Sequence, residues 1–298
     1  MRPLHVLHVI GGGDTGGAMS HLLPLLSALG RSGCDAHLLC LGEGGLADEA
    51  RRRGLSVSVL PMSGARDPRV LASLRRFLAA GPPSDANGPE TLRLAGRPCA
   101  SWDVVHTHGM RANLPVRMIA PVLRHRPCLF TTVHSDLALD YGSATVAKAY
   151  RGIDRATAAM VDRIVCVSES LKGLLMERGY PVEKLVTIHS GLETGRGGTE
   201  SAAGGESSAA GDPPNAAAAA PPRRFGVGTV ARLVAVKDVD LLLEVAGVLR
   251  RTHPDVQVVV VGDGPERARL GTLVSDMGLA STVCFTGRLD DVGPVWRS

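Results

Sequence analysis

Short apolar runs alternate with amphipathic segments along the first half of the chain. Residues 4–10 form an apolar run without a long polar break, which is typical of a strand buried on both faces of a sheet. Residues 17–29 follow with leucines at helical spacing. Further strands are predicted at 36–41, 56–60, 103–107, 128–133 and 163–167, and further helices at 46–53, 68–78, 112–123, 145–160 and 169–177. This alternation predicts a parallel sheet with helices on both faces and right-handed crossovers.

A second, shorter alternation follows a break in the pattern. Between the two, residues 194–223 consist mostly of Gly, Ser, Ala and Pro, a composition that buries too little apolar surface to order itself. Residues 81–100 are also rich in Pro and Gly and are predicted to form a surface loop. Strands are predicted at 225–230, 256–261 and 282–285, and helices at 239–250 and 266–277.

The fold class predicted from these patterns is α/β with two Rossmann-like domains, the second of them incomplete. The first domain is placed at residues 1–193, a flexible low-complexity linker at 194–223, and the partial second domain at 224–298. The second part is short because a Rossmann-like half usually needs roughly 100–150 residues. The chain ends in a segment with the pattern of a further helix.

The charge balance argues against a nucleic-acid partner. The net charge is only +4, and no stripe of basic residues interleaved with aromatics is present. Two arginine clusters, at 51–53 and 75–76, lie in predicted helices, where a solvated helix face is favoured over a contact with anionic lipid. A peripheral contact with the inner face of a membrane therefore stays open.

The cysteines and the N-terminus indicate a cytoplasmic protein. The six cysteines form no C-x-x-C pair, and we interpret them as reduced core residues of a cytosolic protein. They are Cys34, Cys40, Cys99, Cys128, Cys166 and Cys284. The N-terminal residues carry one charge and a short apolar run, which predicts a first strand and not a signal peptide. No apolar stretch reaches the roughly 18–20 residues that span a bilayer.

A glycine-rich turn between the first predicted strand and helix favours phosphate binding. Glycines there let the backbone approach an anion, which the amides of the helix N-terminus face. Gly11, Gly13 and Gly16 satisfy the dinucleotide pattern G-x-G-x-x-G, and Gly17 follows them. The acidic residue that would bind a nicotinamide ribose is expected at the end of the second strand. It could only be Glu43, which lies beyond the predicted end of that strand at residue 41. A tight turn without a ligand remains the alternative.

Two further strand ends carry candidate ligand contacts. Arg232 and Lys237 follow the predicted strand 225–230, and ligands bind at the carboxyl ends of strands in open sheets. Two cations there suit a diphosphate and would stabilise it as it leaves with negative charge. The alternative is a pair of solvated loop cations. Gly262 and Gly264 form another strand-to-helix turn, for which a structural role and a ligand contact are both open.

Histidines occur at the ends of the predicted strands of the first domain. His134 ends the strand 128–133, where a histidine can act as an acid, a base or a hydrogen-bond donor, or have a structural role. His106 and His108 have the spacing of a metal pair. We expect no metal, because His106 lies within the strand, neighbouring strand residues face opposite ways, and no third ligand is evident. Asp238 and Asp240 begin a predicted helix and are interpreted as capping residues.

These segments, in this order, resemble the retaining family-4 glycosyltransferases of the GT-B architecture. The resemblance runs from Met1 to Ser298, except for the tract 194–223 and the loop 81–100. The motifs that carry it are Gly16-Gly17, Asp103-Val-Val-His-Thr-His108-Gly109, the strand ending in His134, Val167-Ser-Glu-Ser170, Ile188-His-Ser-Gly-Leu-Glu193, Gly228-Thr-Val-Ala-Arg232 through Lys237, Gly262-Asp-Gly264-Pro-Glu266 and Val283-Cys-Phe-Thr-Gly287.

The resemblance implies an enzyme that moves a sugar from a nucleotide-diphosphate donor to a glycan or lipid-linked acceptor, in cell-surface or extracellular polysaccharide synthesis. The second domain would hold the donor and the first the acceptor. Gly16 and Gly17 would contact the donor diphosphate, and Arg232 and Lys237 would neutralise the departing nucleotide. His134 would contact the transferred sugar. The resemblance also implies retention of anomeric configuration, and neither a cofactor nor a metal for the chemical step.

Two departures from the family pattern keep other interpretations open. His189 and Ser190 stand where the family usually has Asn, and the sequence stops before the family's E-x7-E segment and last helix. The remaining half sheet would then expose strand edges and apolar faces. A fragment, a truncated reading frame and a degraded, non-catalytic protein all agree with this pattern. A nicotinamide-dependent dehydrogenase using Gly11, Gly13 and Gly16 is a further alternative, which the absence of a well-placed ribose acid disfavours.

Overall fold

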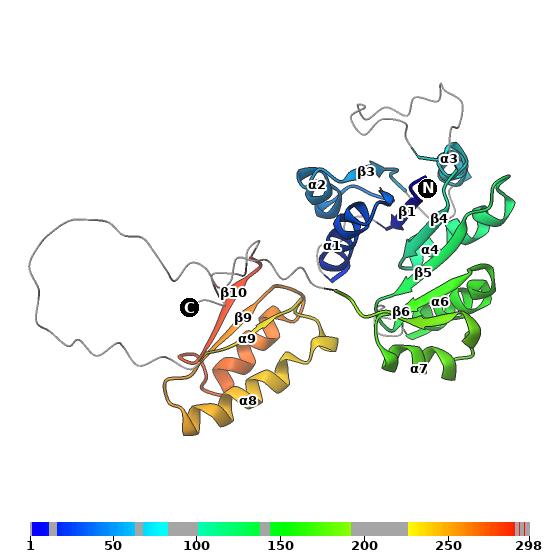
Figure 1. Cartoon of the computed structure of the whole chain (residues 1–298). Coiled ribbons are helices and arrows are strands. Elements are labelled where there is room, and N and C mark those ends of the chain that lie inside the picture. The colour runs from blue at the N-terminus through cyan, green and yellow to red at the C-terminus, as the bar shows by residue number, and fades with distance from the viewer. Residues whose placement is uncertain are drawn as a thin grey trace, which may run out of the picture. The chain divides into compact units, whose positions relative to one another are not determined.

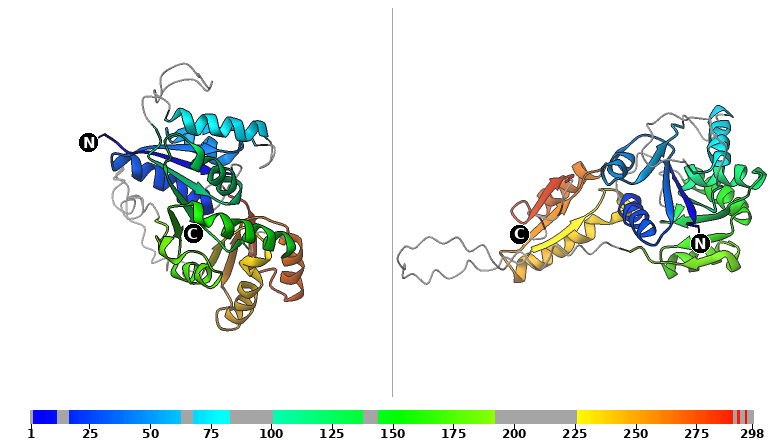
Figure 2. Two further views of the ribbon diagram at one scale, coloured as in Figure 1. Left: turned by 90° about the vertical axis from the view of Figure 1, so that its right-hand side faces the viewer. Right: turned by 45° about the horizontal axis from the view of Figure 1, so that its top comes forward.

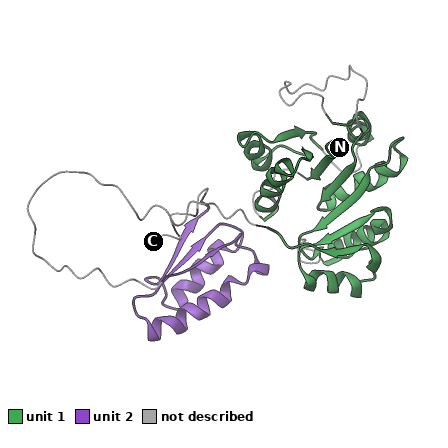
Figure 3. Ribbon diagram, in the orientation of Figure 1, with its two compact units in different colours: residues 1–199 green, residues 200–298 purple. Residues whose placement is uncertain are grey.

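The computed structural model of the chain divides into two compact units, which comprise residues 1–199 and 200–298 (Figure 3). The residues that it describes are 2–11, 17–62, 68–82, 101–137, 144–191 and 226–289, together with 292 and 295. The boundary between the units falls inside the tract 194–223, which lies outside the described residues. Most of the predicted loop 81–100 also lies outside them.

A parallel sheet forms the centre of the first unit (Figure 1). Its strands are β1 (His5–Ile10), β2 (Asp35–Cys40), β3 (Ser56–Val59), β4 (Val104–His108), β5 (Cys128–Val133), β6 (Arg163–Cys166) and β7 (Leu185–Thr187). They lie in the order β3-β2-β1-β4-β5-β6-β7. The order reverses between β1 and β4, and such a switch point opens a crevice at the carboxyl ends of the strands.

Helices connect these strands and lie on both faces of the sheet (Figure 2). The α-helices are α1 (Gly17–Arg31), α2 (Gly45–Arg52), α3 (Pro68–Ala80), α4 (Met110–Ile119), α6 (Ala144–Thr157) and α7 (Glu169–Glu177). Short 3-10 helices are η1 (Ala120–Val122), η2 (Ala158–Met160) and η3 (Val182–Lys184). Helix α3 begins at Pro68, as predicted, because proline lacks an N–H that the first helical position leaves unpaired in any case.

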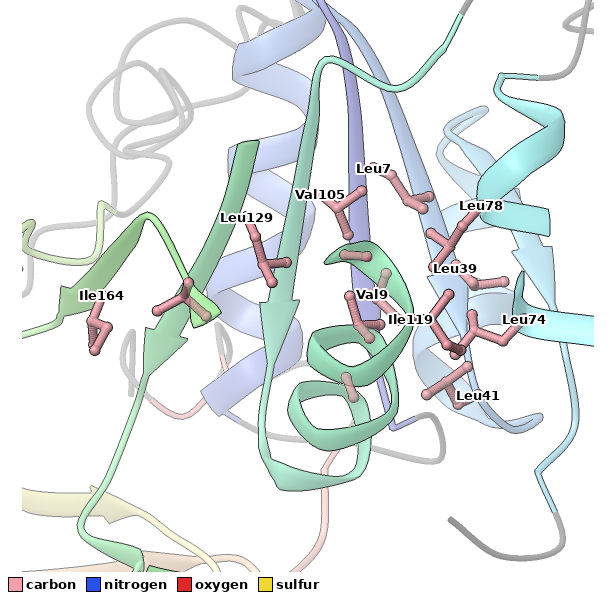
Figure 4. Packing of buried hydrophobic residues seen from close by; sticks show 14 of the residues in the cluster. Leu7, Val9, Leu39, Leu41, Leu74, Leu78, Val105, Ile119, Leu129 and Ile164 are labelled. Atoms are coloured by element: carbon pink, nitrogen blue, oxygen red, sulfur yellow. The ribbon is translucent and has the colours of Figure 1, made fainter. Parts of the chain in front are cut away.

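Two apolar clusters, one on each face, hold this sheet between its helices. One cluster joins Leu7, Val105 and Leu129 to α3 and α4 (Figure 4). The other joins Ile10 and Leu38 to α1 and α2. Strands β1 and β2 contribute side chains to both clusters, which explains why they appear in the sequence as nearly continuous apolar runs.

The second unit has a smaller parallel sheet of the same kind. It contains β8 (Gly226–Val230), β9 (Gln257–Val261) and β10 (Val283–Gly287) in the order β10-β9-β8, with α8 (Val239–Thr252), α9 (Arg267–Asp276) and the 3-10 helix η4 (Ala235–Lys237). Leu243 and Leu270 of the two α-helices pack on Val258 and Val260 of the central strand. Val230 in β8 is 49% exposed.

The predicted alternation of strands and helices is confirmed, with one exception. Strand β7 was missed, since three residues are too few to show a period. The interpretation of the cysteines as core residues was wrong for Cys128 and Cys284, which are exposed; Cys40 and Cys166 are buried as expected. Cys34 is only half-buried, and Cys99 lies outside the described residues. Cys128 is the first residue of β5 and Cys284 lies in β10, a strand at the edge of its sheet, so neither position is covered on both sides.

A buried histidine in β2 predicts a pH-dependent stability. His37 is 3% exposed, and its ring contacts the hydroxyls of Ser56 and Ser58 at 2.6 and 2.9 Å. Burial lowers the pKa of His37 from 6.5 to about 4, a shift that the nearby Asp35 partly opposes. The unfolded chain therefore takes up a proton first, so the stabilisation is complete above pH 6.5 and is lost as the pH falls toward 4.

Between pH 6.5 and 4, the protonation of His37 is expected to lower the free energy of unfolding by on the order of 3 kcal/mol. We expect His37→Phe to remove this part of the pH dependence. The new phenyl ring can pack against Phe77 and Trp102. The ring centroids of these two residues are 6.2 Å apart, and they lie 5.9 and 5.8 Å from the centroid of the His37 ring. The free energy of unfolding would be measured in urea at several pH values between 4 and 7. His125→Gln, at an exposed position, is the control. Parallel pH profiles for wild type and His37→Phe would contradict the prediction.

Candidate functional site

The carboxyl end of the large sheet brings together five histidines from four elements. Strands β1 and β4 pair so that His8 lies opposite His106, and His108 lies two residues further along the same face of β4. His134 follows β5, and His21 lies on α1, the helix that follows β1. The sheet register therefore places side chains from distant parts of the sequence at the switch point.

Hydrogen bonds join three of these rings in a chain. His8 Nδ1 lies 3.0 Å from His108 Nε2, and His108 Nδ1 lies 3.1 Å from His134 Nε2. His106 Nε2 contacts the hydroxyl of Thr132 at 2.7 Å. His8 and His108 are buried, so the chain runs from the interior to the half-buried ring of His134.

Burial keeps these rings uncharged near neutral pH. Desolvation lowers the pKa of His8 to about 3 and that of His134 to about 4. The same cause lowers the pKa of His108 well below its usual value, and the neighbouring histidines add to the effect. His134 is therefore a hydrogen-bonding group at pH 7 and not a charged acid.

The expectation of no metal rested on two premises that the structure overturns. Residues 106 and 108 are two positions apart, so their rings share one face of β4, with centroids 4.5 Å apart and nearly stacked. Third ligands also exist. His8 comes close enough to form a group of three with His106 and His108, and His21 and His134 form a second group of three with His108.

A small cavity of about 70 Å³ lies beside His134 in the first unit. Its lining includes Asn113 of α4, Arg151 of α6 and the Asp136–Arg178 pair, whose guanidinium donates two hydrogen bonds at 2.5 and 2.8 Å to the carboxylate. His134 also lines this cavity, so side chains of positive and negative charge surround a space next to the residue that is predicted to contact the sugar.

The glycine turn after β1 is only partly described. Gly16 lies outside the described residues, so its predicted phosphate contact stays a prediction. Gly17 is the exposed first residue of α1, and a Cβ added to it would meet no atom within 4 Å. Gly17 thus stands exposed at the N-terminus of a helix of 15 residues, the end of a helix that favours an anion.

In the second unit, both predicted cations lie on the connection from β8 to α8. Arg232 follows β8, Lys237 ends η4, and both side chains are exposed. Within the described part of the chain, neither side chain forms an ion pair or a hydrogen bond. The two cations are therefore available to an anion at the carboxyl end of the small sheet.

The turn with Gly262 and Gly264 has a structural reason for its glycines. A Cβ on Gly262 would lie 1.9 Å from the carbonyl oxygen of Ala231, and one on Gly264 would lie 2.3 Å from that of Leu233. Leu233 N–H donates to Asp263 O at 2.9 Å, which ties this turn to the segment that carries Arg232. A ligand contact by either glycine stays a prediction.

The capping interpretation of the Asp238 and Asp240 segment was wrong in its mechanism. Asp238 occupies the N-cap of α8, but its side chain makes no capping hydrogen bond and its φ is +48°. The carboxylate of Asp240 pairs with Arg269 of α9, with both oxygens accepting at 2.7 Å. Asp240 therefore joins the two helices of the unit.

Several residues near the candidate site were missed in the sequence. Asp136, Arg178, Tyr180 and Asn113 come together only in the fold, because they belong to three segments far apart in the chain. His21 and His8 show a signal only in retrospect, as polar residues within otherwise apolar predicted elements.

The described helices include none with the length and apolar character of a membrane span.

The architecture and the comparisons with known proteins define the class. Among solved structures, HepE of Anabaena in complex with UDP and glucose matches with a TM-score of 0.68 and 15% identity, over 97% of this chain and 70% of that one. A glycosyltransferase from Rickettsia africae matches with a TM-score of 0.63 and 15% identity, over 98% and 70%. These similarities show a glycosyltransferase fold of the GT-B type.

Family models place the chain more closely. The model for glycosyltransferase family 4 matches residues 15–196, and the model for glycosyl transferases group 1 matches residues 216–295. The chain belongs to glycosyltransferase family 4, a family of sugar-transferring enzymes. A GDP-mannose-dependent α-(1-6)-phosphatidylinositol monomannoside mannosyltransferase of Mycolicibacterium smegmatis is 38% identical over 69 residues. That match covers 21% of this chain and 18% of the relative.

Proposed function

We propose that the protein transfers a sugar from a nucleotide-diphosphate donor to a hydroxyl of a glycan or lipid-linked acceptor, with retention of anomeric configuration. The bond from the anomeric carbon to the diphosphate breaks, and the acceptor oxygen forms the new bond on the same face. The nucleoside diphosphate leaves with the bonding electrons, and the hydroxyl proton passes to the departing diphosphate. A role in polysaccharide synthesis at the cytoplasmic side of a membrane is part of this proposal.

The observation that carries the proposal is a pair of exposed cations, in a chain of this family, that form no ion pair with any residue the structure describes. Charge grows on the diphosphate as its bond to the sugar breaks, and cations fixed at that place stabilise the transition state more than the ground state. Arg232 and Lys237 lie on one short segment after β8. No metal and no cofactor enters this proposed step.

His134 has a separate part in the proposal. Because its pKa is lowered to about 4, the ring is neutral at pH 7 and can exchange hydrogen bonds with a sugar hydroxyl without protonating it. His108 contacts one nitrogen of this ring at 3.1 Å and so favours one orientation. The amide of Gly17 and the turn at Gly262 and Gly264 are proposed as further contacts of the donor.

Arg232→Ala and Lys237→Ala are expected to weaken nucleotide-diphosphate binding by roughly 10- to 100-fold each, because each removes a charge-assisted hydrogen bond worth about 1.5–3 kcal/mol. Isothermal titration calorimetry with UDP and with GDP would measure this. Arg251→Ala, an exposed cation at the end of α8, is the matched control. Failure of wild type to bind either nucleotide, or equal affinity in all variants, would refute the donor site.

The alternatives make different predictions. A non-catalytic member of the family would bind a nucleotide diphosphate but would neither transfer nor hydrolyse a UDP- or GDP-sugar. The dehydrogenase alternative loses its support, because both family models that match the chain describe glycosyltransferases. Glu43, the only candidate for its ribose contact, is exposed and lies 3.7 Å from Arg51.

A further inference from the structure

Three of the five histidines converge from three elements at the open end of the large sheet. His21 lies on α1, His108 is the last residue of β4, and His134 follows β5. One nitrogen of each ring lies within 4.8 Å of a nitrogen of the other two. His108 is buried, whereas His21 and His134 are half-buried, so the group can be reached from outside.

The separations approach those of a tetrahedral ion site. Imidazole nitrogens bind zinc at about 2.1 Å, which places neighbouring ligand nitrogens about 3.4 Å apart and the ring centroids about 5 Å apart. Here His108 Nδ1 and His134 Nε2 are 3.1 Å apart, and the centroid distances are 5.1, 5.4 and 6.2 Å. Only His21 must approach by about 1 Å, which a half-buried side chain can do by a small rotation.

The orientations of the rings favour this group over the deeper one. In His8, His106 and His108 the ring planes differ by only 19°, 28° and 36°, so no ring is steeply inclined to the other two. The plane of His21 makes angles of 56° with His108 and 71° with His134, whose own planes differ by 30°, so His21 approaches the other two rings from a different direction. The outer group therefore has the geometry of a ligand set.

A fourth histidine supplies the support that metal ligands usually have. Histidines that bind a metal donate their other N–H to an acceptor, which fixes the ring. His8 Nδ1 lies 3.0 Å from His108 Nε2, the nitrogen that the outer group leaves free. His8 is 1% exposed and lies in β1, an interior strand of the sheet, so this support is buried.

The chemistry of the ligands selects the class of ion. Both groups of three that the described residues offer consist of imidazoles alone. Imidazole suits zinc and other late first-row ions, whereas magnesium, calcium and manganese prefer oxygen ligands. Burial also keeps the rings in the neutral form that binds a metal.

We propose that His21, His108 and His134 form a three-histidine site for Zn²⁺ or a similar transition-metal ion, with His8 as the support of His108. Three protein ligands leave the fourth tetrahedral position to water or another small ligand. The ion has no part in the proposed chemical step, which needs no metal. Resting on the proposed function, one consequence follows: an ion on His134 competes with the sugar contact of that ring, so Zn²⁺ inhibits transfer and a chelator restores it.

Titration of the untagged protein with Co²⁺ tests the site directly. Cobalt in a tetrahedral site absorbs visible light far more strongly than the hydrated ion, so the spectrum reports coordination independently of any activity. We expect one equivalent to produce the intense band and Zn²⁺ to remove it by displacement. In His21→Ala and His134→Ala, both at half-buried positions, the band should be lost or the affinity reduced by at least about 10-fold.

The controls separate a specific site from surface binding and from misfolding. His125→Ala, at an exposed position in the same unit, should bind Co²⁺ as wild type does. Zn²⁺ should raise the Tm of wild type and His125→Ala but not that of His21→Ala, because an ion that binds only the folded state stabilises it. Equal Co²⁺ binding by wild type and His21→Ala, or a weak octahedral spectrum, overturns the site. Cobalt binding without UDP or GDP binding would leave the metal site standing and refute only the proposed function.

Discussion

Replacing Arg117 with Met is expected to lower the free energy of unfolding of the first unit by about 3–5 kcal/mol. Arg117 lies on α4 and its side chain is 1% exposed; Asp154 on α6 is 3% exposed, and the two pair at 2.8 Å. Removal of one partner leaves the other charge buried without compensation. That penalty is much larger than the net contribution of an intact buried pair.

The surroundings of this pair make its loss expensive. The same guanidinium nitrogen also donates to the hydroxyl of Thr157 at 2.8 Å, and the second one donates to Thr131 at 3.3 Å. Tyr180 donates to the other oxygen of Asp154 at 2.7 Å, and burial, followed by the charge of Asp154, raises the pKa of its phenol. Strand β5, helix α6 and the segment after α7 therefore depend on one ion pair.

A double-mutant cycle would measure the coupling. Urea unfolding can be followed by the fluorescence of Trp102, which is 3% exposed in the core of the first unit, in a Trp296→Phe background. Asp154→Leu alone should cost a similar amount, and Arg117→Met combined with Asp154→Leu should cost clearly less than the sum of the single changes. Strictly additive costs, or a loss below about 1 kcal/mol for Arg117→Met, would show that the pair contributes little.

The sequence predicts the strands and helices well for a physical reason. In a parallel sheet covered on both faces, each strand is an apolar run and each helix has one apolar stripe, so the two periods separate clearly. Residues 128–133 and 169–177 were predicted with the bounds that the structure shows. The exposed Cys128 and Cys284 show the limit, because an apolar run does not reveal which residues lie at the end of a strand or on an edge strand.

The candidate site was only partly predictable, since its contacts join distant segments. Arg232 and Lys237 could be found, because two cations after a strand are a local signal. The histidine group could not, because it depends on the pairing of β1 with β4, which sets His8 opposite His106. Asp154 is likewise 37 positions from Arg117, and no local pattern links a mid-helix arginine to that carboxylate.

Gly264→Ala is expected to destabilise the second unit by about 2–5 kcal/mol and to weaken nucleotide binding beyond that effect. The added Cβ would lie 2.3 Å from the carbonyl oxygen of Leu233, a backbone atom that cannot rotate away. Gly262→Ala adds backbone strain to a similar clash, because φ there is +137° and the Cβ would lie 1.9 Å from Ala231 O. The two carbonyl groups belong to Ala231 and Leu233, the neighbours of Arg232 in the sequence. A backbone shift that relieves either clash therefore displaces Arg232.

Hydrogen exchange measured by mass spectrometry would report each unit separately. Gly264→Ala should speed exchange in β8, β9 and the segment after β8, while amides of the first unit exchange as in wild type. Gly278→Ala isolates the cost of a positive φ, since φ is +64° and the added Cβ meets nothing within 4 Å; about 1–2 kcal/mol is expected, with nucleotide affinity unchanged. If Gly264→Ala and Gly278→Ala had equal effects on nucleotide affinity, the turn would not position Arg232, and its glycines would serve only the local backbone.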